Sequence, residues 1–312
     1  MVAGATGFVG RRVVRELLAA GHHVVALVRT PASAQDLAAA GVQLVTGDML
    51  RPESFRSVVA EVDAVVNTAQ YPVTGRFTNA KAQKVRFADH LLTDTLATAC
   101  IAAGKRLVYT SGVFNYGDRG QEVITEATPF NPSPIGTGHA AEVTALRRLH
   151  RDGGLDVVVI SPGFVVGPGG LFKTSFYDQV QKRRLRVIGP GANYWSCIQV
   201  DDLAAAFIVA LHHAPAGAEY NVVDDEPLTL RALVDEITSA MGRKSVGNIP
   251  PWLMGLIIGR PLVESLIASF RVSNQRLRTE LGWSPTFGTV AAALPSTLAA
   301  LDAQDRLTGR SA

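Results

Sequence analysis

A glycine-rich segment at residues 4–10 constrains the fold more than any other part of the chain. It reads Gly-Ala-Thr-Gly-Phe-Val-Gly and leads into residues 8–20, where Val9, Val13 and Leu17 share one helical stripe. Glycines at these spacings allow a tight turn and a close approach of the backbone to a phosphate. The start of the helix offers unpaired N–H groups and a positive dipole end. The segment therefore predicts a βαβ unit that binds a dinucleotide.

Short apolar runs alternate with helix-period segments through the first two-thirds of the chain. The runs are residues 24–28, 42–45, 64–66, 107–110 and 157–160, and the helical segments include residues 8–20, 89–103 and 139–151. This alternation predicts an α/β fold, a Rossmann-type doubly wound parallel sheet covered on both faces.

After Gly163 this rhythm stops, which predicts a different kind of structure. We expect a basic helix near Lys182, a helix starting near Asp201, one short strand at residues 220–223 and otherwise mostly helices. Residues 1–165 are accordingly predicted to form the dinucleotide-binding Rossmann domain. Residues 166–312 are predicted to form a smaller, mostly helical substrate-binding region interwoven with the Rossmann core.

Composition excludes several other classes of protein. Hydrophobic residues make up 47% and charged residues 18%, the net charge is +3, and Lys and Arg are scattered, so no nucleic-acid partner is expected. Cys100 and Cys197 have no Cys or His neighbour at metal-ligand spacing, so no metal is expected. The apolar segment 249–270 is broken by Arg260 and Glu264, so its uninterrupted stretches are too short to span a membrane. Because the glycine motif opens the chain, we expect no signal peptide and a cytoplasmic protein, either a monomer or a homodimer.

The end of the second predicted strand bears on the choice of cofactor. A protein that binds NAD places Asp or Glu there, but this chain has Val28 followed by Arg29 and Thr30. A guanidinium can hold a 2′-phosphate through charge-assisted, bidentate bonds. We therefore predict NADP(H) as the cofactor, with Thr30 and Ser33 as helpers. The alternative is that Arg29 is an ordinary solvated loop arginine.

Residues that follow the predicted strands complete the expected cofactor site, because open α/β sheets bind ligands at the carboxyl ends of their strands. Asp48 and Met49 would lie beside the adenine, and Thr68 and Ala69 beside the nicotinamide ribose; Asp48 is equally consistent with a loop cap. The predicted cofactor contacts are Gly4, Thr6, Gly7, Phe8, Val9, Gly10, Arg29, Thr30, Asp48, Met49, Thr68, Ala69, Thr110, His139, Pro162 and Gly163.

Further blocks in the sequence carry a family resemblance. Besides residues 4–10, they are Gly47-Asp48, Tyr109-Thr110-Ser111 with Tyr116-Gly117, Ser161-Pro162-Gly163 with Gly167-Pro168-Gly169, and residues 198–202, 220–223 and 281–285. In this order, over nearly the whole chain, they resemble the extended short-chain dehydrogenase/reductases of the NAD-dependent epimerase/dehydratase type. The resemblance implies a soluble enzyme with a nicotinamide cofactor and a small-molecule substrate.

The catalytic pattern of that family is not intact. The family has Tyr-x-x-x-Lys, and the matching positions here hold Ile135 and His139. Counting from Tyr116-Gly117 puts the family's Ser or Thr at Gly112, with Ser111 one residue away. The resemblance therefore leaves Ser111 and His139 as catalytic candidates. His139 would hold the nicotinamide ribose as the family's lysine does; the alternative is a histidine that only packs and caps. Positions 135 and 139 would share one face if both were helical.

The missing tyrosine shapes the predicted reaction, because reduction of a ketone leaves an alkoxide that needs a proton. Tyr71, Tyr116 and Tyr177 lie in predicted loops and are alternative donors. A substrate phenol beside the ketone could also stabilise the oxyanion. The apolar segment 250–270 could cover a flat aromatic substrate or pack in the core.

We therefore expect an NADPH-dependent ketoreductase acting on a large aromatic ketone. The combination resembles an atypical branch of the family that reduces angucyclinone polyketides in antibiotic biosynthesis. The alternatives are a non-catalytic NADP-binding redox-sensing regulator and an epimerase or dehydratase acting on a sugar-like substrate.

Overall fold

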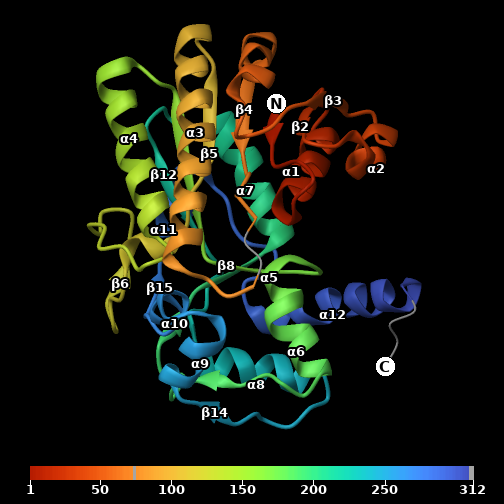
Figure 1. Ribbon diagram of the computed structural model, residues 1–312, viewed down its shortest axis with the longest axis vertical. Helices are drawn as coiled ribbons and strands as arrows, with labels where there is room; N and C mark the ends of the chain where they lie inside the picture. The colour runs from red at the N-terminus through yellow and green to blue at the C-terminus, as the bar shows by residue number, and fades with distance from the viewer. Residues whose placement is uncertain (73–74, 309–312) are drawn as a thin grey trace. The chain divides into compact units, whose positions relative to one another are not determined.

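A computed structural model describes residues 1–72 and 75–308 of the 312-residue chain (Figure 1). Its main feature is a seven-stranded sheet with the order β12-β7-β5-β4-β1-β2-β3. The strands are β1 (Val2–Ala3), β2 (Val25–Val28), β3 (Gln43–Thr46), β4 (Ala64–Asn67), β5 (Arg106–Thr110), β7 (Val157–Pro162) and β12 (Glu219–Val222).

The strand order reverses at β1, which has β2 on one side and β4 on the other, both parallel to it. Parallel pairing continues from β2 to β3 and from β4 through β5 to β7. The predicted α/β doubly wound parallel sheet is thereby confirmed. The reversal creates a switch point between β1 and β4, and open α/β sheets bind their ligands outside such a point.

By its contacts the chain divides into two compact units. The first comprises Met1–Gly112, Gly136–Ser161 and Ala204–Tyr220, and the second Val113–Ile135, Pro162–Leu203 and Asn221–Ala312. Each unit therefore takes segments from both halves of the sequence. The assignment of residues 1–165 to cofactor and 166–312 to substrate stays a prediction.

The helices of the sheet are α1 (Phe8–Ala19), α2 (Gln35–Ala39), α3 (Asn79–Ala103), α4 (Thr137–Gly153) and α7 (Val200–His213), with the 3-10 turns η1 (Pro31–Ala34), η2 (Pro52–Ser54) and η3 (Arg56–Glu61). Helices α3 and α4 lie side by side (Figure 1). Right-handed crossovers place α1 and α3 on opposite faces of the sheet. Gly104 and Gly154 end α3 and α4 in the left-handed conformation, with φ of 62° and 70°.

The second unit is built from small sheets and mostly short helices. Its strands are β6 (Val123–Ile124), β8 (Phe164–Val166), β9 (Val187–Ile188), β10 (Tyr194–Trp195), β11 (Cys197–Gln199), β13 (Leu228–Thr229), β14 (Asn248–Ile249) and β15 (Arg271–Val272). Its helices are η4 (Val113–Tyr116), α5 (Gly170–Phe172), the π-helical turn η5 (Lys173–Tyr177), α6 (Asp178–Gln181), α8 (Leu230–Ala240), α9 (Pro251–Ile258), α10 (Arg260–Leu266), α11 (Gln275–Leu281) and α12 (Val290–Leu307). Phe172, Phe176 and Trp195 centre its main apolar core.

One expectation about a helix is corrected. The basic helix near Lys182 is wrong, because α6 ends at Gln181 and Arg183 takes a left-handed φ of 56° that closes the turn. The apolar segment 249–270 contains two short helices, α9 and α10, which are separated by Gly259 with a φ of 103°. No helix in the described part of the chain is long and apolar enough to cross a membrane.

Candidate functional site

The glycine-rich turn leaves no room for a side chain at Gly4 or at Gly10. Gly4 has a φ of +82°, and a β-carbon on it would lie 2.6 Å from the backbone nitrogen of Ala69. A β-carbon on Gly10 would collide with the carbonyl oxygen of Gly4. The Gly7 N–H donates to that same oxygen at 2.8 Å. Two backbone segments, after β1 and after β4, therefore meet with only hydrogen atoms between them. A dinucleotide pyrophosphate requires a backbone that it can approach closely, at the start of a helix whose first N–H groups lack helical partners. This turn meets both requirements.

Polar contacts tie the carboxyl ends of β1, β4 and β5 together at the switch point. The backbone N–H and the hydroxyl of Thr68 both donate to the Ala3 carbonyl at 3.0 Å. The Ala69 N–H donates to the buried Asn67 side chain at 3.1 Å, and the Thr110 hydroxyl donates to the Asn67 carbonyl at 2.7 Å. The side chains of Thr68 and Thr110 thus hold strand ends in place, at the edge where a ligand would lie.

Arg29 directly follows β2 and is exposed. Within residues 1–72 and 75–308 it forms neither a hydrogen bond nor an ion pair. Arg11 differs, because its guanidinium pairs with Asp36 and donates to the carbonyls of Thr6 at 3.1 Å and Ser33 at 3.0 Å. The Ser33 hydroxyl donates to the Thr30 carbonyl at 2.7 Å. Arg29 is therefore a positive charge at the end of β2 that no described residue neutralises.

Asp48 has the contacts of a loop cap. Its carboxylate accepts from the Leu50 N–H at 3.0 Å, and its own N–H donates to the Ser54 hydroxyl at 3.0 Å. Arg51 lies 3.9 Å from the same carboxylate. Met49, which follows it, is half-buried. Both residues lie at the end of β3, and a contact with adenine stays a prediction.

His139 lies in the first turn of α4, and its imidazole Nδ1 is 3.0 Å from the Tyr109 hydroxyl of β5. Ile135 precedes the helix, and its N–H donates to the Ser265 hydroxyl at 3.2 Å. Positions 135 and 139 do not share a helical face, because α4 begins only at Thr137 and Ile135 lies outside it. Tyr109 is not among the residues predicted from the sequence, since its contact depends on where α4 starts beside β5. The sequence signal for it is a tyrosine within the predicted strand run 107–110.

Titratable groups surround this pair between α3 and α4. Burial lowers the pKa of His139 from 6.5 to about 4, so the imidazole is neutral near neutral pH. Burial, together with the charges of Glu142 and Asp89, raises the pKa of Tyr109 well above 10. Burial also raises the pKa of Asp89 to about 6, against a hydrogen bond of 3.1 Å from the Tyr71 N–H. His90 lies 3.0 Å from the Glu142 carboxylate.

The segment after β5 provides no hydroxyl at the position that the family resemblance indicates. Gly112 occupies it, and a β-carbon there would meet no described atom within 4 Å. Ser111 is buried, and its N–H donates to the Ile160 carbonyl at 2.7 Å. A catalytic role for Ser111 stays a prediction.

The predicted site residues do not all fall in one unit. Gly4 to Gly10, Arg29, Thr30, Asp48, Met49, Thr68, Ala69, Thr110, Ser111 and His139 belong to the first unit, and Pro162 and Gly163 to the second. Gly163 donates its N–H to Val222 at 3.1 Å, and a β-carbon on it would collide with the Ser196 carbonyl. Close backbone packing alone explains a glycine at position 163.

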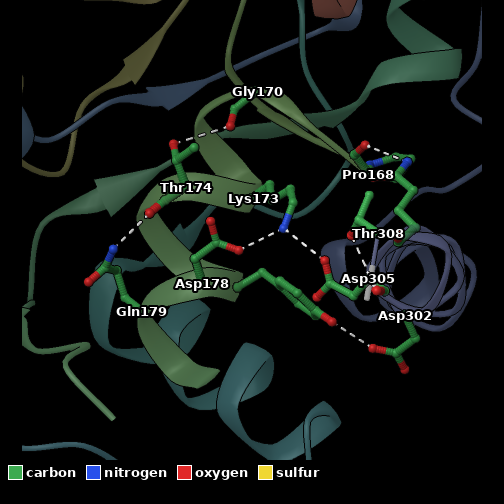
Figure 2. A network of polar contacts seen from close by, with 11 residues as sticks. Pro168, Gly170, Lys173, Thr174, Asp178, Gln179, Asp302, Asp305 and Thr308 are labelled. Atoms are coloured by element: carbon green, nitrogen blue, oxygen red, sulfur yellow. Dashed lines mark hydrogen bonds and ion pairs between the residues drawn. The ribbon is translucent and has the colours of Figure 1, made fainter. Parts of the chain in front are cut away.

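Two of the alternative tyrosine donors are engaged elsewhere in the second unit. The buried Tyr116 hydroxyl donates to the Asn221 side chain at 2.9 Å. The Tyr177 hydroxyl donates to Asp302 at 2.7 Å, beside a network in which Lys173 contacts Asp178 and Asp305 (Figure 2). Both hydroxyls therefore have structural partners.

In the described residues no three His, Cys, Asp or Glu side chains are grouped to hold a metal.

The fold and the glycine-rich turn define a dinucleotide-binding protein of the Rossmann type. The sequence pattern of the NAD dependent epimerase/dehydratase family matches residues 1–223. The chain belongs to this family, and it is an NAD(P)-dependent enzyme of it.

Several characterised proteins are similar to the chain. A 3-diazoavenalumate denitrifying reductase from a Streptomyces species is 30% identical over 300 residues, which cover 92% of this chain and 95% of that protein. A 2-alkyl-3-oxoalkanoate reductase from Stenotrophomonas maltophilia is 29% identical, covering 79% and 76%. A ketoreductase of a farnesylated dihydroquinoline-1-oxide from Stigmatella aurantiaca is 29% identical, covering 80% and 75%.

Solved structures share the fold at lower identity. DesIV, a dTDP-glucose 4,6-dehydratase from Streptomyces venezuelae solved with NAD bound, has a TM-score of 0.82 at 23% identity, covering 98% of this chain and 97% of that one. Human epimerase family protein SDR39U1, solved with NADPH, has a TM-score of 0.78 at 23% identity, covering 95% and 97%. Both nicotinamide cofactors thus occur on this fold.

Proposed function

We propose that the chain is an NADPH-dependent ketoreductase that reduces a ketone on a large aromatic substrate. The observation that carries the proposal is Arg29, an exposed guanidinium without a partner among the described residues, at the end of β2. An acidic side chain there would bind the ribose hydroxyls of NAD and repel a 2′-phosphate. Arg29 instead supplies the charge that a 2′-phosphate requires.

The residues of the first unit have distinct roles in this proposal. The turn at Gly4 and Gly10 receives the pyrophosphate, and Arg29 binds the 2′-phosphate. Bound NADPH supplies a hydride for the substrate carbon. His139 donates a hydrogen bond to the nicotinamide ribose or to the oxyanion left on the substrate, because a neutral imidazole keeps one N–H.

The proton for that oxyanion is proposed to come from the substrate. Ile135, at the family's tyrosine position, has no proton to donate, and Tyr116 and Tyr177 have structural partners. Tyr71, whose N–H donates to Asp89, stays an alternative donor. A phenol beside the ketone can pass its proton to the alkoxide, and the phenolate then recovers a proton from water. Angucyclinone-type polyketides carry this arrangement, and the reductases named among the relatives support reduction as the reaction class.

The test is loss of nicotinamide absorbance with ketones that do or do not carry a neighbouring phenol. We expect NADPH oxidation with the hydroxylated ketones and little with their O-methyl ethers. Equal rates for both series would reject substrate assistance. Tight NADPH binding without oxidation across the panel would favour the regulator instead.

A second candidate is favoured by Ile135 together with the Streptomyces relative, whose name describes reductive loss of nitrogen from a diazo compound. Replacement of an aryl diazonium group by hydride forms a C–H bond, releases N₂ and leaves no oxyanion. Such a reaction needs no proton donor. This chain has none at the family's tyrosine position, because Ile135 occupies it. An aryl diazonium substrate and an aromatic ketone, each incubated with NADPH deuterated at C4, distinguish the two candidates. N₂ release with deuterium on the arene supports this one, and deuterium on a carbinol carbon supports the ketoreductase.

A further inference from the structure

The contact between Tyr109 and His139 joins two elements of the first unit. Tyr109 comes from β5 and His139 from the first turn of α4. The Tyr109 oxygen lies 3.0 Å from His139 Nδ1, with the two rings tilted by 55°. Tyr109 is only 3% exposed, so its hydroxyl cannot turn to a partner in water.

Chemistry decides which atom of this contact carries the proton. A phenol is a stronger acid than a neutral imidazole N–H, and an imidazole nitrogen is a stronger base than a phenol oxygen. The Tyr109 hydroxyl therefore donates and Nδ1 accepts. With Nδ1 as the acceptor, the one proton of the neutral imidazole is on Nε2.

We infer that Tyr109 is a positioning residue that holds His139 as a neutral Nε2–H donor facing its ligand. A free histidine exchanges its proton between two nitrogens and ionises near neutral pH. In this chain the hydroxyl of Tyr109 selects one tautomer, and burial keeps the ring neutral. The donor is then present before any ligand arrives, so no reorganisation is needed when charge develops on the bound oxygen.

This assignment changes what His139 can contribute. A lysine at this position would present a positive charge, whereas His139 presents only a dipole. The imidazole therefore stabilises an oxyanion by a hydrogen bond and does not act as the proton source. The ligand of Nε2 rests on the proposed function, but the position of the proton does not.

The tautomer can be measured directly by ¹⁵N NMR of the histidine rings. The chain has seven histidines, and His139→Gln assigns the His139 signals by their disappearance. In the wild-type protein without ligand we expect a pyridine-type shift for Nδ1 and a pyrrole-type shift for Nε2. A pyrrole-type Nδ1 would overturn the inference, and this shift is read from the wild-type protein once the His139→Gln spectrum has assigned the ring.

Two tyrosine variants complete the experiment. Tyr109→Phe should leave His139 exchanging between both tautomers, and should weaken NADPH binding or lower kcat by about tenfold at most, the worth of one hydrogen bond. Tyr116→Phe removes a buried tyrosine hydroxyl that bonds to Asn221 instead, so it should leave the His139 shifts unchanged. Unchanged His139 shifts in folded Tyr109→Phe would contradict the inference. If no ketone or diazonium is reduced, the proposed function fails while the NMR result stands.

Discussion

The carbonyl oxygen of Gly4 occupies the space that a β-carbon of Gly10 would need, so no side chain fits at position 10. The same β-carbon would lie 2.9 Å from the Thr68 hydroxyl. The turn between β1 and α1 is thus closed from one side by β4. Its open side is left to a ligand that needs backbone N–H groups.

Gly10→Ala should abolish or strongly weaken dinucleotide binding, because the backbone must move by a large part of an ångström to admit the methyl group. We expect a loss of at least about 100-fold in NADPH affinity, measured by titration of nicotinamide fluorescence, with folding checked by circular dichroism. Gly247→Ala is the matched control, since a β-carbon there meets no described atom within 4 Å. Normal NADPH affinity in folded Gly10→Ala would contradict the structure of the turn.

His139 should make stability depend on pH in a predictable direction. Its pKa is about 4 in the folded protein and 6.5 in an unfolded chain, so the unfolded chain takes up the proton first as pH falls. Wild-type stability is therefore lost between these two values, by about 2 kcal/mol at about pH 5 relative to about pH 7. His139→Gln does not titrate, and urea unfolding at both pH values should show the wild type losing that amount relative to the variant. A constant difference between the two proteins would show that the imidazole is not buried.

Lys173 should anchor the C-terminal helix α12 within the second unit (Figure 2). Its ammonium lies 2.7 Å from Asp178 and 3.4 Å from Asp305. Burial acts to lower the pKa of Lys173, but the two carboxylates outweigh it and raise that pKa. Lys173→Met leaves two partly buried carboxylates without their cation, which should cost about 1–3 kcal/mol of unfolding free energy and speed amide exchange in α12.

A double-mutant cycle with Asp305→Asn separates this contact from general damage. The cost of Lys173→Met should shrink when Asp305 is already neutral, because the unpaired charge is then gone. Additive costs would mean that Lys173 and Asp305 are not coupled.

Local patterns predicted the sheet well. The apolar run 24–28 became β2 (Val25–Val28), and the run 107–110 became β5 with one residue added. Residues buried on both faces of a parallel sheet are nearly all aliphatic, so each run marks a strand almost residue by residue. Helix α3 begins at Asn79, ten residues before the predicted start at residue 89, because its first turns are largely exposed and lack an apolar stripe. The Thr78 cap, which accepts from the Lys81 N–H, is the signal that marks this start.

The site divides in the same way between local and non-local information. The tight turn at the glycines and the place of Arg29 at the end of β2 are predictable because both follow from their position in one βαβ unit. The pairing of Tyr109 with His139 joins residues 30 positions apart on different elements, and no periodicity indicates it. Whether positions 135 and 139 share a helical face depends on where α4 starts, and the sequence pattern does not show that this helix begins only at Thr137.

The most direct test of the account is the cofactor preference of Arg29→Ala. Wild type, Arg29→Ala and Arg148→Ala should each be titrated with NADPH and NADH at the same ionic strength; Arg148 is an exposed arginine of α4 that pairs with Asp152 and serves as the charge-matched control. We predict that Arg29→Ala weakens NADPH binding by about 10- to 100-fold and NADH binding by less than about twofold, while Arg148→Ala changes neither. Equal losses for both cofactors, or a wild type that prefers NADH, would contradict the assignment of the 2′-phosphate to Arg29.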